Sequence, residues 1–408
     1  MKESPLFYLK RGFNMEWIKA ESKRAQAKLI AMRRDLHQIP EIGGSLPKTR
    51  KYVCEKLSAL GIPYRLNETD DGIVAEIRGD REGKTIAFRA DMDGLHIEEE
   101  TPVPFRSEIA GQMHGCGHDA HTAVLLCAAE ILYAHKSELC GSVRLLFQTG
   151  EETGSGAKNM LSEGALDGVD AICALHVGNL AGDRLKAGDI TVLAGPVSAG
   201  KNKFTVTVKG KGTHSAFPDK GVDPILIAAR IVNGCEELAA RELPAGTAAV
   251  LSFGSLQAGK DHNTIPEEAV IKGSIRCQNE NLREFLGERL KTLSAHIAAA
   301  YRAECEVELK KGSSTVMNDA GLASLAADAV ACALGKDRVL TASASALMGS
   351  DDFANYAERT AGLYFFLHTN NEEKGITEAN HSPRFDIDES VLWEGVAAYV
   401  AIAARYLK

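Results

Sequence analysis

The chain has 408 residues, a length that usually corresponds to two domains rather than to one hydrophobic core. Its composition is that of an ordinary globular protein with a formal net charge of −8, and no basic run marks a surface for nucleic acid or an anionic membrane. No apolar stretch approaches the length of a membrane-spanning helix, and the charged N-terminal segment is too short in its apolar part for a signal peptide. Nine cysteines without paired spacings favour a reducing compartment, so we predict a cytoplasmic protein.

The first half of the chain alternates helices with strands. Residues 16–60 are predicted to be helical, because apolar residues recur at helical spacing on both sides of Pro40, and Gly61–Pro63 ends this region. The next expected elements are strands at 72–78 and 85–90, a helix at 121–134, and strands at 143–148 and 171–175. This alternation predicts an α/β domain with a mixed, largely parallel sheet and helices on both faces.

The pattern changes after residue 196. The expected order becomes strand, helix, two strands, helix and strand, which is the order of a ferredoxin-like α+β domain. These elements are predicted at 203–209, 224–238, 249–256, 269–277, 282–301 and 305–310. The α/β pattern then resumes, with a strand at 363–367 and a closing helix at 391–407. We therefore predict a catalytic domain built from residues 1–196 and 315–408, interrupted by a domain at 197–314.

Metal-capable side chains gather in four short segments. The segments are His114–Asp119, Glu151-Glu152, Leu175-His176 and Asn380–Pro383. A divalent cation in a hydrolase needs several nitrogen, sulfur or oxygen ligands and one position left open for water. The sequence predicts as ligands Cys116, His118, Glu152, His176 and His381. Glu151, beside a ligand, is the candidate carboxylate for proton transfer.

Each segment alone has a plainer interpretation. Cys116 could be a buried thiol beside a capping histidine, and adjacent glutamates often lie on solvated helix faces. Their positions argue against this, because Glu151 and Glu152 follow one expected strand and His176 closes another. In open α/β sheets, ligands bind at the C-terminal ends of strands. The remaining nearby histidines are interpreted as structural or as lining the pocket: His37, His96, His114, His121 and His368.

Nine motifs, in order along nearly the whole chain, are Arg33–Glu41, Arg89–Asp93, His114–Asp119, Glu151-Glu152, Leu175-His176, Gly212–Ala216, Asn263–Pro266, Gly349–Phe353 and His381–Asp386. In this order and spacing, they resemble the metal-dependent amidohydrolases that include hippurate hydrolases, auxin-conjugate hydrolases and N-acyl amino acid deacylases. Aminoacylases and glutamate-releasing carboxypeptidases are more distant relatives. The resemblance implies a zinc-exopeptidase-like catalytic domain, a dimerisation or lid domain, and two divalent metal ions per subunit bound by the five ligands named above.

The resemblance also implies roles for residues outside the ligand set. Glu151 would act as the general acid and base, and His214 would reach the active site of a partner subunit and stabilise the oxyanion there. Asn263 and Arg276 would hold the carboxylate of the amino acid product, although Arg276 could also be a solvated strand residue. Asp93 would hold a ligand histidine in one tautomer.

The predicted function is metal-dependent hydrolysis of the amide bond of an N-acyl amino acid or a similar small conjugate, by a cytoplasmic homodimer. A dipeptidase or carboxypeptidase of the same superfamily is the first alternative, and a catalytically silent metal-binding regulatory relative is the second. The thiolate favours zinc, the resemblance includes manganese, and cobalt or nickel also suits such ligands. His96, Thr149, Asp219 and the segment Gly43–Ser45 depart from the residues usual in such enzymes, which leaves the substrate preference open.

Overall fold

The structure is a computed structural model that describes residues 15–178, 185–342 and 347–408. The chain divides into two compact units. The first unit comprises Met1–Gly195, Met317–Ser345 and Asp352–Lys408, and the inserted unit comprises Pro196–Val316 and Ala346–Asp351. Residues 347–351 thus go with the inserted unit, whereas the sequence predicts them in the closing part of the catalytic domain, 315–408.

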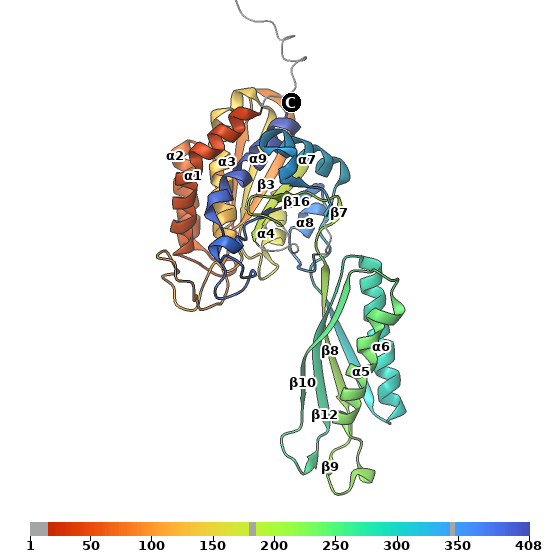
Figure 1. Ribbon diagram of the computed structural model, residues 1–408. Helices are drawn as coiled ribbons and strands as arrows, with labels where there is room; N and C mark the ends of the chain where they lie inside the picture. Colours follow the sequence, from red (N-terminus) through yellow and green to blue (C-terminus); the bar gives the residue numbers. More distant parts are fainter. Residues whose placement is uncertain (1–14, 179–184, 343–346) are drawn as a thin grey trace, which may run out of the picture. The chain divides into compact units, whose positions relative to one another are not determined.

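The first unit contains an eight-stranded mixed sheet (Figure 1). Its order is β1 (Tyr64–Leu66), β2 (Ile73–Arg78), β4 (Cys140–Gln148), β3 (Arg81–Asp91), β5 (Ala171–Gly178), β16 (Ala361–His368), β6 (Ile190–Thr191) and β15 (Val339–Leu340). The central strands β4, β3, β5 and β16 run parallel to one another, while β2 is antiparallel to β4 and β6 to β16. The predicted mixed, largely parallel sheet is confirmed.

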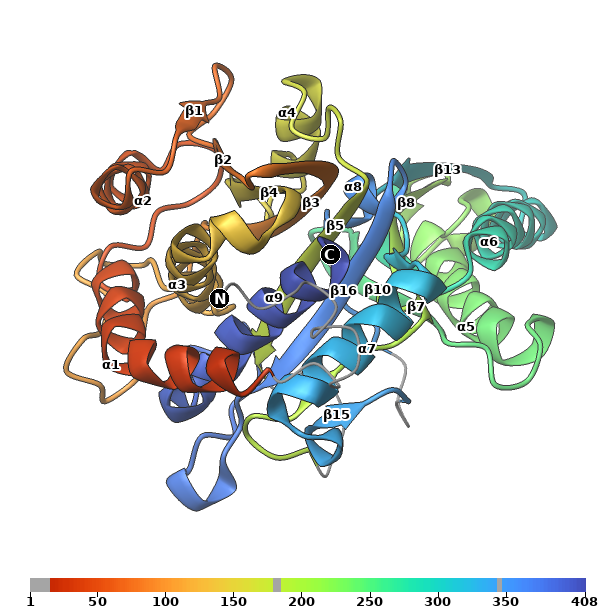
Figure 2. The same cartoon turned by 90° about the horizontal axis from the view of Figure 1, so that it is seen from above.

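Helices cover both faces of this sheet, as Figure 2 shows. One face carries α3 (His118–Ala134), α9 (Leu392–Tyr406) and α7 (Ala320–Leu334), with α1 (Glu16–His37) packed on α3 and α9. The other face carries the short helices α4 (Gly156–Ser162) and α8 (Ala354–Ala357), and α2 (Pro47–Leu60) packs beside α3. Because side chains alternate along a strand, every second residue of β5, such as Leu175, enters the main core with the larger helices.

The inserted unit is a four-stranded antiparallel sheet with two helices on one face. The sheet order is β10 (Ala249–Ala258), β12 (Glu268–Cys277), β8 (Gly200–Lys209) and β13 (Glu304–Lys311). The helices α5 (Pro224–Glu242) and α6 (Glu280–Ala300) bury Phe204, Val206 and Val208 of β8, and the alternate residues of β8 on the opposite face are at least partly exposed. This is the predicted ferredoxin-like order.

A small two-stranded sheet of β9 (Thr213–His214) and β11 (Thr264–Ile265) forms the tip of the inserted unit, beyond the end of β8. Two further short strands, β7 (Gly195–Pro196) and β14 (Met317–Asn318), lie near the unit boundaries. None of the described helices is long and apolar enough to cross a membrane.

Two elements differ from the sequence expectation in ways that matter for the site. The helix α3 begins at His118, three residues earlier than expected, so this predicted ligand lies in the first turn. The strand β5 continues to Gly178, so His176 lies within the strand rather than after it. Both residues therefore take their orientation from regular backbone structure.

Candidate metal centre

The five predicted ligands come from different segments of the chain. They meet at the C-terminal ends of the central strands of the large sheet. Cys116 precedes α3, His118 begins it, and His176 lies near the C-terminal end of β5. Ligand-capable atoms of these three residues all lie within 4.8 Å of one another. Cys116 also forms a group of the same size with Glu152 and His381. Cys116 belongs to both groups, so cations held by the two groups would share its thiolate.

The two buried histidines present the same ring nitrogen to this centre. His118 Nδ1 lies 2.8 Å from the carbonyl oxygen of Asp93, and His176 Nδ1 lies 2.7 Å from that of Val177. A carbonyl oxygen can only accept, so each Nδ1 carries the proton and each Nε2 has its lone pair available for a metal. His118 Nε2 is buried without a hydrogen-bond partner among the described residues, and His176 Nε2 lies 3.6 Å from Cys116 Sγ. The donor set therefore fits a divalent cation.

The group of Cys116, Glu152 and His381 stabilises a positive charge on the His381 ring. His381 Nε2 lies 3.2 Å from Glu152 Oε1, and hydrogen bonds to Cys116 and Glu152 raise the pKa of His381 to about 10. The backbone of His381 has φ 71°, a left-handed conformation that is uncommon for residues other than glycine. Its N–H donates to the carbonyl oxygen of Gly115 over 2.7 Å, which holds this strained residue beside the Cys116 loop.

Asp93 orients the glutamate pair. Its two carboxylate oxygens accept from the backbone N–H groups of Glu151 and Glu152, at 3.1 and 3.2 Å. The pair lies in a turn after β4, so strand alternation does not set the directions of the two side chains. The hydrogen bonds that Asp93 accepts from the backbone N–H groups of Glu151 and Glu152 fix the relative orientation of these two residues instead. The backbone carbonyl of Asp93, rather than its carboxylate, makes the short contact with the His118 ring.

Glu151 lies among the ligands without being part of the two thiolate groups. One of its carboxylate oxygens lies within 4.8 Å of ligand atoms of His118 and Glu152. Its Oε1 accepts from the backbone N–H of Asp352 over 3.4 Å. A carboxylate at this position can exchange a proton with a molecule bound at the centre.

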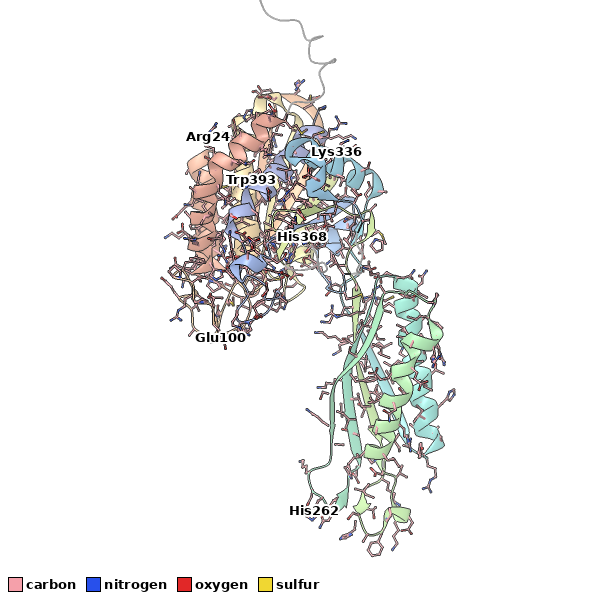
Figure 3. All side chains as sticks on the ribbon, viewed as in Figure 1. Arg24, Glu100, His262, Lys336, His368 and Trp393 are labelled. Carbon is pink, nitrogen blue, oxygen red and sulfur yellow. The ribbon has the colours of Figure 1, made fainter. Side chains whose placement is uncertain are left out.

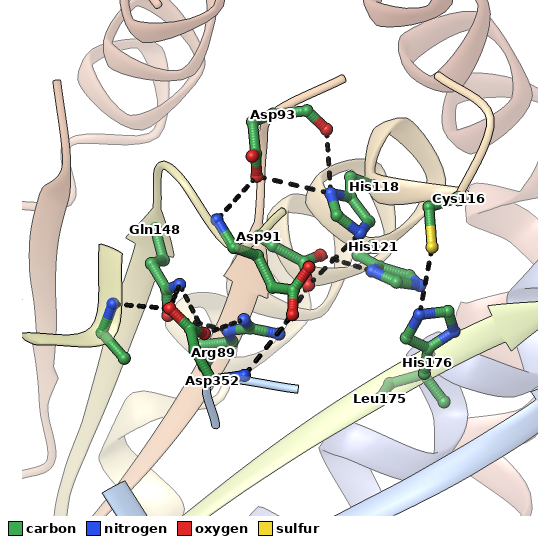
Figure 4. Close-up of polar contacts among 12 residues, drawn as sticks. Arg89, Asp91, Asp93, Cys116, His118, His121, Gln148, Leu175, His176 and Asp352 are labelled. Atoms are coloured by element: carbon green, nitrogen blue, oxygen red, sulfur yellow. Dashed lines mark hydrogen bonds and ion pairs between the residues drawn. The ribbon is translucent and has the colours of Figure 1, made fainter. Parts of the chain in front are cut away.

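Arg89 forms a buried network beneath the ligands, shown in Figure 4. Its guanidinium donates to Asp91 Oδ2 at 2.5 Å, to Asp352 Oδ1 at 2.9 Å and to Gln148 Oε1 at 3.0 Å. Although burial opposes ionisation, Arg89 and the neighbouring histidines hold the pKa of Asp91 well below its ordinary value. The network thus ties β3 and β4 to the segment that contacts Glu151.

His121 extends this network to β5. Its Nε2 accepts from the backbone N–H of Val177 over 2.8 Å, so its Nδ1 must carry the proton that it donates to Asp91 Oδ1. With both nitrogens engaged, His121 fixes the strand next to His176. From the sequence alone His121 is interpreted as structural or as lining the pocket, and this link between two strands is not predicted. The alternation of Arg89 and Asp91 on β3, followed by Asp93 just after the strand, was the sequence signal for such a network.

The predicted functional residues of the inserted unit lie at its two ends, with His214 and Asn263 at the tip and Arg276 at the opposite end of the sheet. His214 pairs with Thr264 in the tip sheet, and Asn263 precedes Thr264, close to His262, which is labelled in Figure 3. Arg276 lies opposite Lys201 at the other end of the sheet, where its Nη1 donates to the carbonyl oxygen of Met348 over 2.9 Å. Lys209 lies eight positions after Lys201 along β8, roughly 27 Å at the usual rise of a strand. His214 and Arg276 of one chain therefore cannot contact the same small molecule.

A family model described as Peptidase family M20/M25/M40 matches residues 87–405. The chain belongs to this family. Related sequences include an N-acetylcysteine deacetylase of Bacillus subtilis, 36% identical over 391 residues that cover 95% of this chain and 98% of the relative. Another is thermostable carboxypeptidase 2 of Saccharolobus solfataricus, 34% identical over 402 residues that cover 96% and 98% of the two chains.

A solved structure of the M20 family has the same fold. It is the YXEP protein of Bacillus subtilis, described as a dinuclear metal binding peptidase, with a TM-score of 0.81 and 33% identity. The match covers 94% of this chain and 99% of that one. The predicted family and the predicted enzyme class are confirmed: the chain is a metal-dependent amidohydrolase of family M20, and it uses divalent metal ions.

Proposed function

We propose that this enzyme hydrolyses the amide bond of an N-acyl amino acid and releases a carboxylic acid and an amino acid. The observation that carries the proposal is the convergence of Cys116, His118, Glu152, His176 and His381 around Glu151. An amide is a poor electrophile with a poor leaving group, so its hydrolysis needs an activated water, a polarised carbonyl and a proton donor for the nitrogen. A related sequence named N-acetylcysteine deacetylase supports this substrate class.

We assign the two thiolate groups to two divalent ions that share Cys116. Bound there, the ions would lower the pKa of a water molecule and polarise the amide carbonyl. The mixed sulfur, nitrogen and oxygen ligands favour zinc, with manganese, cobalt and nickel as the other candidates. The dinuclear centre named for the related Bacillus subtilis structure supports two ions.

The protein's own residues would move the protons and hold the substrate. Glu151 would take a proton from the water and return it to the leaving nitrogen. His214 would donate a hydrogen bond to the developing oxyanion, and Arg276 with Asn263 would bind the carboxylate of the amino acid half. Asp93 would keep Glu151 and Glu152 in their relative orientation.

These assignments require two copies of the chain. His214 and Arg276 lie at opposite ends of the inserted unit, so a substrate that contacts both must contact two subunits. We therefore propose a homodimer in which His214 acts in the site of its partner. A cytoplasmic location stays a prediction from the cysteine content, and none of the nine cysteines, all in described segments, forms a disulfide.

The competing function is that of a carboxypeptidase or dipeptidase, which the relative in Saccharolobus solfataricus favours by its name. The test is a hydrolysis screen after reconstitution with zinc or manganese. N-acetyl, N-benzoyl, N-aminobenzoyl and indole-acetyl amino acids would be compared with dipeptides that have a free amino group. Turnover of the capped amino acids supports the proposal. Turnover of free dipeptides alone assigns the protein to the competing function, and hydrolysis of neither class refutes both.

A further inference from the structure

Three cationic side chains lie together on the open face of the inserted sheet. Lys201 and Lys203 alternate along β8 and so point to the same face, away from α5 and α6. Arg276 lies directly opposite Lys201 in the adjacent strand β12, on that face. Figure 1 shows the two strands side by side, with both helices to the right of them. We call these three residues the Lys201 cluster.

The carboxylate on this face that lies near the cluster is that of Glu308 in β13, which is opposite Thr205 and already pairs with Lys310. Among the described residues of the inserted unit, none of the acidic side chains forms an ion pair with Lys201, Lys203 or Arg276. Two other lysines on the same face do have partners: Lys209 lies 3.7 Å from Glu306, and Lys310, directly opposite Lys203, lies 3.3 Å from Glu308. Partial burial, and then the nearby charges of Arg276 and Lys203, lower the pKa of Lys201.

We propose that Lys201 and Lys203 form a subsite for a second carboxylate next to the one bound by Arg276, so that the preferred substrates are N-acyl derivatives of aspartate or glutamate. The inference rests on the proposed function, in which Arg276 holds the α-carboxylate of the amino acid half. The two carboxylates of such an amino acid are separated by a short carbon chain, and cross-strand neighbours such as Arg276 and Lys201 have a comparable spacing.

Arginine suits the binding of the α-carboxylate, and lysine suits the binding of the side-chain carboxylate. The guanidinium of Arg276 is planar and matches a carboxylate at a fixed position, and its bond to the carbonyl of Met348 holds it in place. A lysine is a point charge on a flexible stem, so Lys201 and Lys203 can follow a side-chain carboxylate whose distance differs between aspartate and glutamate. Pairing with an anion would also relieve the repulsion within the cluster.

The test compares parent holoenzyme with Lys201→Met and with Lys272→Met as a matched control. Lys272 is an exposed lysine of β12 opposite Thr205, and it has no ion-pair partner among the described residues of the inserted unit. The substrates are N-acetylglutamate and N-acetylglutamine, which differ only in the charge of the side chain. Binding of the products L-glutamate and L-glutamine is measured by calorimetry on the same proteins, so that the result does not depend on hydrolysis.

The parent enzyme should prefer the acidic member of each pair by roughly tenfold or more, because a hydrogen-bonded contact to a charged group has about that effect. Lys201→Met should remove most of this preference, mainly through KM, and Lys272→Met should keep it. If both variants lose the preference for the acidic substrate equally, or if 0.5 M salt removes it from the parent enzyme, the preference comes from long-range electrostatic attraction. Either result would overturn the subsite.

Two further outcomes separate this inference from the proposed function. Efficient hydrolysis of N-acetylglutamine with no preference for the acidic substrate refutes the subsite and leaves the function standing. Tight, Lys201-dependent binding of glutamate without hydrolysis of any N-acyl amino acid refutes the function and keeps the subsite. N-succinylalanine carries its second carboxylate on the acyl half, and a preference for it over N-acetylglutamate would also refute the assignment.

Discussion

The metal centre and the inserted sheet organise their functional groups in opposite ways. In the metal centre, His118, His176 and Asp93 are buried and each is held by a hydrogen bond that leaves its functional atoms in one direction. In the inserted unit, His214 and Lys201 lie on an exposed tip or an open sheet face. The first region is preorganised by the fold of one chain. The second depends on what binds to it, which is the behaviour expected of a recognition surface.

The largest expected effect concerns proton transfer in the preorganised region. Glu151→Gln keeps the size of the side chain but removes its basicity, so kcat should fall roughly a thousandfold while the metal content stays unchanged. Single-turnover kinetics and elemental analysis measure the two quantities. Glu358→Gln, an exposed glutamate after α8, serves as the control. A Glu151→Gln enzyme within tenfold of the parent would remove this residue from the mechanism.

Loss of a ligand should have a different signature from loss of the base. Cys116→Ala and His381→Ala should each lose at least one equivalent of metal together with most of the activity, because each removes a donor atom from the centre. Cys127→Ala is the matched control, since Cys127 is a buried thiol of α3 outside the ligand groups. Full metal content in both ligand variants would place the metal elsewhere.

A smaller effect is expected from Asp93→Asn. The new amide can turn only one acceptor toward the two backbone N–H groups, so the relative orientation of Glu151 and Glu152 should be less well fixed. We expect kcat to fall roughly 10- to 100-fold with little change in KM. Asp170→Asn, which alters a carboxylate that accepts from the backbone of Thr85 at the other end of the sheet, should leave kcat unchanged. An unaltered kcat in Asp93→Asn would show that the clamp is not needed.

The sequence was most informative where chemistry and backbone pattern coincide. The strands before Glu151 and around His176 have clear apolar runs, and the order of elements between residues 200 and 311 was predictable from periodicity alone. The early start of α3 was not. Its N-cap is Gly117 with φ 85°, so the usual side-chain capping signal is absent.

The contacts between segments that are far apart in the chain could not be predicted from the sequence. Asp91 and His121 are 30 residues apart, and their contact depends on the packing of α3 against β3. The backbone clamp of Asp93 on Glu151 and Glu152 likewise joins the end of β3 to the turn after β4. A motif indicates which side chains are available, but it does not indicate which of them orient the others.

Mixing two inactive variants tests most directly the claim that one chain supplies the metal centre and another supplies the tip. Glu151→Gln and His214→Ala subunits are exchanged, and heterodimers are isolated with two different tags. The isolated heterodimers should have about half of the parental activity, because each has one intact site of two, and the unfractionated mixture should have about a quarter. His262→Ala, an exposed histidine of the same tip, should be active without mixing. Confirmed heterodimers that remain inactive would contradict the account, because His214 would then act within its own chain or not at all.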